Sequence, residues 1–268
     1  MIKHKPGVTL VASHRGISGG NIPCNTKAAF NISLQEGTDI VELDVAKSKD
    51  GKLFVFHPGM EKRHLDVDCS LKDMTAAEIE KLRFVNQDRV PTSYGISYLE
   101  DILMFLKDKA YINVDKFWTD IEGITQMIRH VGVEKQVIVK TPASLEHIEN
   151  VKKFAPDLPY MAVIKNKDEI SDYIRDYGSN YVGVEAIFSS DDDEIVSDEY
   201  IEKLHKNGMF IFGNAIVYNE QRNISAGHTD DVALNGNPDL GWGWFVDKKF
   251  DVIQTDWCML VKEYLKNR

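Results

Sequence analysis

The sequence contains 268 residues, with 32 Lys and Arg against 42 Asp and Glu, so its formal charge is −10. A hydrophobic fraction of 43 % and a charged fraction of 28 % are those of a globular protein and exclude extended disorder. The acidic balance disfavours nucleic acid and anionic membranes as main partners, because both attract basic surfaces.

Short apolar segments rich in β-formers alternate with helix-like segments along the whole chain. The predicted strands are 9–13, 40–45, 110–114, 136–140, 160–164, 181–188, 209–213 and 251–255. The predicted helices are 25–35, 97–108, 119–131, 144–154, 168–176, 194–206 and 258–267. This alternation, without a Pro/Gly/Ser linker, predicts one α/β domain over 1–268 with a parallel sheet. Eight strands are the number that closes a (β/α)8 TIM barrel, and an open doubly wound sheet is the alternative.

Two stretches interrupt the alternation. Residues 47–60 contain an Asp50-Gly51 turn signal between apolar runs, which predicts a hairpin that extends the second strand. The following segment, about 58–96, is predicted to be an insertion with a single short helix near 75–83. Residues 217–243, rich in Asn, Gly and Asp, predict a long loop after the seventh strand. Long loops in compact domains are usually functional or mobile.

Cysteine usage and the absence of long apolar runs bear on the compartment. Cys24, Cys69 and Cys258 are far apart and form neither a disulfide framework nor a paired metal-binding motif, which is typical of a reducing compartment. The apolar run at 8–12 is too short for a secretory signal, and no stretch approaches the ~20 apolar residues that span a bilayer. We therefore expect a cytoplasmic protein without stable membrane insertion. The sequence carries no signal for an oligomeric state.

Polar residues gather where the predicted strands end, which is the active face of a barrel. They are Ser13, His14, Arg15, Glu42, Asp44, His57, Asn113, Asp115 and Lys116. Glu42 and Asp44 share one face of their strand, because strand residues two apart point the same way. With Asp115 they offer the oxygen ligands that Mg²⁺ or Ca²⁺ takes, whereas a structural salt bridge is the alternative. Zinc is disfavoured, because neither cysteine nor a close histidine pair accompanies them.

The order of these motifs resembles the glycerophosphodiester phosphodiesterase family. The motifs that carry the resemblance are His14-Arg15-Gly16, Pro23-x-Asn25-Thr26, Glu42-x-Asp44, Lys47-x-x-Asp50-Gly51, His57, Asn113-Val114-Asp115-Lys116, Lys140, Glu185, Asn207-Gly208 to Asn214 and Gln254-Thr255-Asp256. The match covers essentially the whole chain in the correct order. It implies a metal-dependent TIM barrel that hydrolyses glycerophosphodiesters to glycerol 3-phosphate and an alcohol.

The resemblance also implies roles for individual residues. The divalent-ion ligands would be Glu42, Asp44 and Asp115, the general acid/base pair would be His14 and His57, and Arg15 would hold a phosphate oxygen. Two imidazoles that titrate near neutral pH suit the proton transfers, and a guanidinium fork suits a phosphate. We also expect Lys140 and Glu185 to contact the phosphate and hydroxyl groups of a small phosphodiester, because strand ends converge on the pocket. Trp257, just beyond the last strand, is expected to wall the alcohol side.

Two positions depart from the family pattern and keep two other functions open. Cys24 stands where the family usually has Glu, and Pro58 follows His57 where Asp is common, so an orienting carboxylate for His57 must come from elsewhere. One alternative is a lipid phosphodiesterase that resembles the phospholipase-D toxins and forms a cyclic phosphate. The other is a barrel that binds a phosphate ligand without catalysis.

Overall fold

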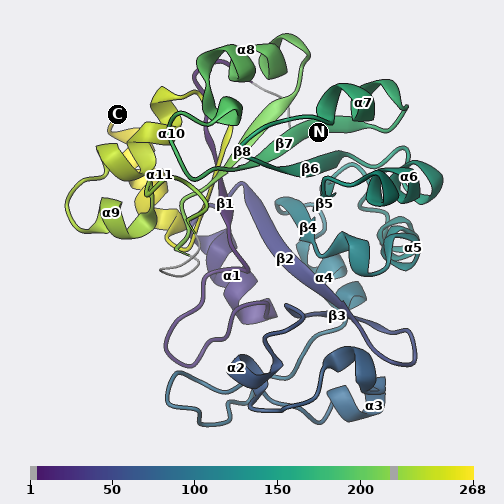
Figure 1. Cartoon of the computed structure of the whole chain (residues 1–268). Coiled ribbons are helices and arrows are strands. Elements are labelled where there is room, and N and C mark those ends of the chain that lie inside the picture. The colour runs from purple at the N-terminus through teal and green to yellow at the C-terminus, as the bar shows by residue number, and fades with distance from the viewer. Residues whose placement is uncertain (1–4, 218–222) are drawn as a thin grey trace.

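The structure is a computed structural model that describes residues 5–217 and 223–268. Eight parallel strands form a closed barrel (Figure 1), because β1 pairs with β2 on one side and with β9 on the other. The barrel strands are β1 (Leu10–Ser13), β2 (Ile40–Lys47), β4 (Tyr111–Asp115), β5 (Val137–Pro142), β6 (Tyr160–Lys165), β7 (Tyr181–Ile187), β8 (Phe210–Asn214) and β9 (Val252–Thr255). The predicted TIM barrel is confirmed, and the open-sheet alternative is wrong.

Helices cover the outside of the barrel (Figure 1). They are α1 (Lys27–Gln35), α4 (Leu99–Leu106), α5 (Ile121–Val131), α6 (Leu145–Phe154), α7 (Ser171–Asp176), α8 (Asp198–Lys206) and α11 (Cys258–Lys266). Their ends follow local chemistry: the Ser144 hydroxyl accepts from the His147 N–H at the start of α6, and Gly208 adopts φ +72° after α8. Within the described residues, no helix combines the length and apolar content needed to cross a bilayer.

The barrel interior is divided into an apolar and a polar half. Apolar side chains fill the amino-terminal half: Ala12, Ile40, Ile138, Met161, Val182, Phe210, Phe212 and Val252. A larger apolar cluster lies between strands and helices and includes Ile112 and Val114 of β4. Asn113, which lies between these two residues, and Asp115 point to the barrel interior, because side chains alternate between the two faces of a strand. Polar groups are therefore concentrated at the carboxyl end of the barrel.

The insertion after β2 is more helical than the sequence predicts. The predicted hairpin is present: β3 (Leu53–Val55) pairs antiparallel with β2, and Gly51 takes φ +83° in the turn. The insertion then contains α2 (Glu61–Leu65), the 3₁₀ turn η1 (Leu71–Asp73) and α3 (Ala76–Ile79). The predicted short helix near 75–83 is present as α3, although it ends at Ile79. The prediction that it is the single helix of the insertion is wrong, because α2 is too short to show a helical period in the sequence.

The insertion has an apolar cluster of its own, separate from those of the barrel. Its buried members are Ala46, Phe54, Phe56, Leu65, Leu71, Ala76, Ile79, Phe84 and Ile96. Figure 1 shows α2 and α3 beyond the β2–β3 hairpin, outside the ring of barrel helices.

The second interrupted stretch also contains helical structure. The described part of 217–243 carries α9 (Asp230–Leu234), which the Thr229 hydroxyl caps, and the π-helical turn η4 (Asp239–Gly243). This turn leads into α10 (Trp244–Asp247). The prediction of a loop is therefore partly wrong, because neither short element spans enough turns to show a helical period in the sequence. Residues 218–222 of this stretch lie outside the described residues.

The predicted helix 194–206 divides into the 3₁₀ turn η3 (Glu194–Val196) and α8.

Candidate active site

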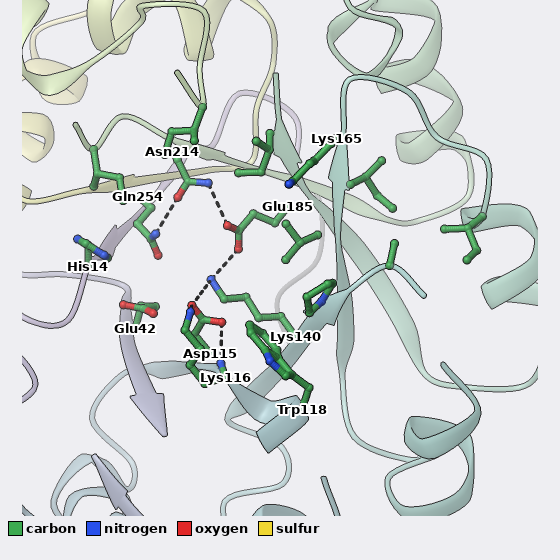
Figure 2. Close-up of a pocket in the computed structure, with 18 of the residues that line it drawn as sticks. His14, Glu42, Asp115, Lys116, Trp118, Lys140, Lys165, Glu185, Asn214 and Gln254 are labelled. Carbon is green, nitrogen blue, oxygen red and sulfur yellow. Dashed lines mark hydrogen bonds and ion pairs between the residues drawn. The ribbon is translucent and has the colours of Figure 1, made fainter. Parts of the chain in front are cut away.

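A cavity of about 960 Å³ opens at the carboxyl ends of the strands. Figure 2 shows charged side chains from both sides of the barrel pointing into it. Seven of the nine predicted site residues line this cavity: His14, Arg15, Glu42, His57, Asp115, Lys140 and Glu185. Asp44 lies fully buried beneath it. The cavity therefore brings together residues that lie in β2, β4, β5 and β7 or directly follow β1 and β3, which are far apart in the sequence.

Glu42, Asp44 and Asp115 form one carboxylate cluster. One oxygen of each lies within 4.8 Å of the others. The strand register explains this closeness, because Asp44 of β2 pairs directly with Asp115 of β4. Asp44 Oδ1 is buried and has no hydrogen-bond partner among the described residues. A buried carboxylate oxygen with unused acceptor capacity, beside two further carboxylates, fits a hard divalent cation such as Mg²⁺ or Ca²⁺.

The charges around the cluster shift its pKa values in opposite directions. Burial and the charge of Asp44 raise the pKa of Glu42 to about 7. Burial acts the same way on Asp44, but Arg15 and Lys116 outweigh it and hold the pKa of Asp44 below its usual range. Because three adjacent carboxylates repel one another when ionised, a bound divalent ion would favour the ionised form of all three.

Arg15 joins the first strand to this cluster. Its backbone N–H donates to Glu42 Oε2 at 2.8 Å, and its Nε lies 2.9 Å from Asp44 Oδ2. Both contacts require a tight turn after β1, where Arg15 has φ +56° and Gly16 has φ +74°. A Cβ at Gly16 would lie 2.9 Å from the Ala29 carbonyl carbon, so the glycine permits the close approach of this turn to α1.

His14 is held by a carboxylate that the sequence analysis did not assign. Its Nδ1 lies 3.0 Å from Asp256 Oδ1, just after β9. Because an ionised carboxylate only accepts hydrogen bonds, Nδ1 carries the proton and Nε2 is the nitrogen that can exchange a proton with a substrate. The backbone N–H of Asp256 in turn donates to the buried Asp230, which also accepts from Trp242 and Thr255. The position of Asp256 at a strand end could have indicated a site residue. Asp230 lies in the predicted loop, where the sequence carries no such signal.

His57 is held by a backbone carbonyl. Its Nδ1 donates to the Pro58 oxygen at 2.8 Å, and its Nε2 lies 3.9 Å from Asp44 Oδ1. A carbonyl cannot donate, so Nε2 of the neutral ring bears the lone pair and faces the cluster. Burial, with help from the charge of Arg15, lowers the pKa of His57 from its usual value despite the opposing charge of Asp44. The substitution of Asp by Pro58 thus leaves His57 oriented through the backbone.

On the other side of the cavity, polar side chains form a row that links β5 to β9 (Figure 2). Lys140 Nζ donates to Glu185 Oε2 at 2.7 Å, Asn214 Nδ2 donates to Glu185 Oε1 at 3.0 Å, and Gln254 Nε2 donates to Asn214 Oδ1 at 2.7 Å. Lys140 also lies 3.7 Å from Asp115 Oδ2. These carboxylates outweigh burial and keep the pKa of Lys140 above its usual value. The row therefore couples the predicted substrate residues to the carboxylate cluster.

The chain matches the model of the glycerophosphoryl diester phosphodiesterase family over residues 14–214. It belongs to this family. A glycerophosphodiester phosphodiesterase from Caldanaerobacter subterraneus is 35 % identical over 56 % of this chain and 64 % of its own length. This relative is therefore matched over less than two thirds of its own length. A solved structure from Parabacteroides distasonis, 20 % identical, covers 97 % of this chain and 87 % of its own with a TM-score of 0.75. A phosphodiesterase from Oleispira antarctica, solved with sn-glycerol-3-phosphate, has a TM-score of 0.69 at 15 % identity, over 97 % of both chains.

Two of the predicted or noted positions lie at the margin of this family site. Trp257 has a relative exposure of 49 % and is not among the described residues that line the cavity, so its contact with substrate stays a prediction. Cys24, at the position where the family usually has Glu, has a pKa raised to about 11, mainly by burial. Its thiol is therefore protonated at neutral pH and is not a nucleophile.

Proposed function

We propose that this protein hydrolyses glycerophosphodiesters to glycerol 3-phosphate and an alcohol with the help of Mg²⁺ or Ca²⁺. The observation that carries the proposal is the cluster of Glu42, Asp44 and Asp115 at the same cavity as two oriented imidazoles. The three carboxylates would hold the cation, which, when bound, offsets the negative charge of the phosphodiester. Arg15 lines the same cavity and would bind a phosphate oxygen.

The two histidines divide the proton transfers between them. His57, with its lowered pKa and its Nε2 lone pair facing the cluster, accepts the proton of the water that attacks phosphorus. His14 donates a proton to the leaving alcohol, and the carboxylate of Asp256 stabilises the imidazolium form that does so. Lys140 and Glu185 bind the phosphate and hydroxyl groups of the substrate from the opposite wall.

The comparisons and the composition support the same substrate class. A relative is named as a glycerophosphodiester phosphodiesterase, and a structural neighbour was solved with sn-glycerol-3-phosphate. The formal charge of −10 supports a small phosphodiester rather than nucleic acid or an anionic membrane as the partner. The three free cysteines support a cytoplasmic location.

The test is incubation with glycerophosphocholine and glycerophosphoethanolamine in the presence of Mg²⁺, Ca²⁺ or Mn²⁺, with glycerol 3-phosphate measured enzymatically. We expect release with at least one ion and its loss after chelation. Phosphorus NMR of the product separates the two alternatives: a persistent cyclic phosphate indicates chemistry like that of the phospholipase-D toxins. Binding of glycerol 3-phosphate with no turnover of any diester or ion indicates a non-catalytic barrel and overturns the proposal.

A further inference from the structure

The polar row that links β5 to β9 ends in an amide oxygen that the proposed hydrolysis does not use. Gln254, on β9, lines the cavity and has a relative exposure of 2 %. Its Nε2 donates to Asn214 Oδ1 at 2.7 Å, whereas its Oε1 is buried and has no hydrogen-bond partner among the described residues. Buried acceptors are nearly always satisfied in proteins. This oxygen, at the wall of a ligand cavity, is therefore available to a ligand.

The orientation of the Gln254 amide is determined by a carboxylate two side chains away. Glu185 forms an ion pair with Lys140 and, as a carboxylate, can only accept hydrogen bonds. Asn214 must therefore turn its Nδ2 toward Glu185 Oε1, 3.0 Å away, which leaves its Oδ1 facing Gln254. That oxygen requires a donor, so Gln254 presents Nε2 to Asn214 and keeps Oε1 for the cavity. Turning either amide over would bring two acceptor oxygens together.

The chemistry of the row specifies the donor that Gln254 Oε1 can take. The oxygens of a phosphodiester carry no proton at neutral pH, so a second acceptor repels them and excludes the phosphate from this position. Lys140 belongs to the same row and points into the cavity as Gln254 does (Figure 2), and its pKa is held above its usual value by the surrounding carboxylates. An ammonium donor would meet this positive charge. A neutral hydroxyl donor would meet neither repulsion.

We propose that Gln254 is a specificity-determining residue whose Oε1 accepts a hydrogen bond from a hydroxyl group of the glycerol moiety. Glu185 and Asn214 act as positioning residues, because they fix the amide with its oxygen toward the cavity; the remaining lone pairs of Glu185 stay available to the substrate. This inference rests on the proposed function and deepens it. Glycerol is the part that all glycerophosphodiesters share, and a buried acceptor of fixed orientation suits an invariant part.

Substrate analogues that lack one hydroxyl test the proposal on the unaltered protein. Glycerophosphoethanolamine is compared with the phosphoethanolamine esters of propane-1,2-diol and propane-1,3-diol, which lack the terminal and the secondary hydroxyl. We expect kcat/KM to fall at least about tenfold for one of the two analogues, because the buried acceptor then stays unpaired. A further pair, the glycerophosphodiesters of ethylene glycol and of ethanol, removes a hydroxyl from the other alcohol and should leave kcat/KM nearly unchanged.

Variants of Gln254 connect the loss to this side chain. Gln254→Met keeps the length of the side chain without its acceptor, and it should lower the ratio of kcat/KM between the full substrate and the sensitive analogue at least about fivefold. Gln254→Glu keeps an acceptor and should retain the ratio, although its negative charge lowers kcat/KM for every diester. A merely structural role would lower kcat/KM for all substrates alike and leave the ratio unchanged.

Two further variants complete the set. Asn214→Leu removes the acceptor that fixes Gln254 Nε2, so the amide can turn over, and the ratio should fall by a smaller factor than in Gln254→Met. It also keeps the test valid if Gln254→Met does not fold, which circular dichroism reports. The control is Gln126→Met, which changes an exposed glutamine on α5 that does not line the cavity and should leave the ratio unchanged.

The outcomes separate failure of this inference from failure of the proposed function. Equal kcat/KM for the full substrate and both analogues overturns the inference and leaves the proposed function intact. A loss confined to the other alcohol, or one that is undiminished in Gln254→Met, also overturns it. If no diester is hydrolysed with any ion, the proposed function fails, and glycerol 3-phosphate and the phosphates of the two diols are titrated calorimetrically. Tighter binding of glycerol 3-phosphate that Gln254→Met abolishes supports the inference, and equal binding overturns it.

Discussion

The two sides of the barrel mouth are built from the same strand geometry and have opposite chemistry. The β1–β2–β4 side places three carboxylates and Arg15 around one buried point, each held by hydrogen bonds or ion pairs. The β5–β8 side carries one polar row and, one layer outward, aliphatic side chains that face the cavity. The comparison teaches that one ring of parallel strand ends can concentrate negative charge on one side of its mouth and carry paired polar and aliphatic side chains on the other.

The largest expected effect lies on the catalytic side. His14→Ala and His57→Ala should each lower kcat/KM by about 10²- to 10⁴-fold, because each removes a proton-transfer group. A p-nitrophenyl leaving group, which needs no proton, should restore much of the activity of His14→Ala but not of His57→Ala. Steady-state kinetics on both substrates measure this. The control is His130→Ala, which changes an exposed histidine on α5. Equal restoration of both variants would contradict the assigned roles.

A second prediction concerns the polar row that links β5 to β9. Lys140→Met removes the cation from between Glu185 and Asp115, where the Lys140 side chain is only 4 % exposed. Because the buried carboxylates of Glu185 and Asp115 then lose a compensating positive charge, the free energy of unfolding should fall by about 3–5 kcal/mol, as chemical denaturation can measure. Lys206→Met serves as the control. Its exposed ion pair with Glu202 should contribute under about 1 kcal/mol, and a comparable loss in both variants would contradict the prediction.

A smaller effect is expected from the group that orients His14. Asp256→Asn keeps the shape of the Asp256 side chain but removes the charge that stabilises the imidazolium. We expect kcat to fall about tenfold, less than for a fully buried carboxylate, because Asp256 is half exposed. A matched control is Asp191→Asn. Asp191 also holds a histidine, with its Oδ1 2.8 Å from His228 Nε2, but this pair does not line the cavity. Loss of stability without loss of kcat would show that Asp256 only supports the fold.

The smallest effect is a displacement of the pH profile. The pKa of His57 is lowered from its usual 6.5, mainly by burial. As a base it must be neutral, so kcat/KM should rise with pH through this lowered pKa and reach its plateau by pH 7. A bound metal ion would add positive charge near His57, lower its pKa further and so move the acidic limb of the profile to lower pH. An acidic limb centred above pH 6.5 would contradict the role of His57.

Much of the barrel was predictable because its signals are local. Each predicted barrel strand lies within two residues of the observed one at either end, since short apolar runs between helical segments are distinctive. Glu42 and Asp44 were placed on one face from their spacing alone. Their closeness to Asp115 depends on the β2–β4 register, which the sequence does not contain as a local pattern.

The unpredicted parts depend on contacts between distant segments. Asp230 accepts a hydrogen bond from the backbone of Asp256, and it lies in α9, a helix too short to show a helical period in the sequence. The orientation of His57 by the Pro58 carbonyl follows from backbone conformation, which residue identity does not reveal. α2 is similarly set by tertiary contacts: the buried Glu61 at its start accepts from Ser70 and the backbone of Leu71.

We expect the insertion after β2 to open as a unit separate from the barrel. Its apolar cluster is separate from those of the barrel, and His57 lies at the junction, next to Phe56 of that cluster. Opening of this unit alone would withdraw one imidazole from the cavity while the carboxylate cluster stays folded. On warming, the protein would then stop turning over substrate before its barrel melts, and amide exchange in 56–98 would report that subglobal transition.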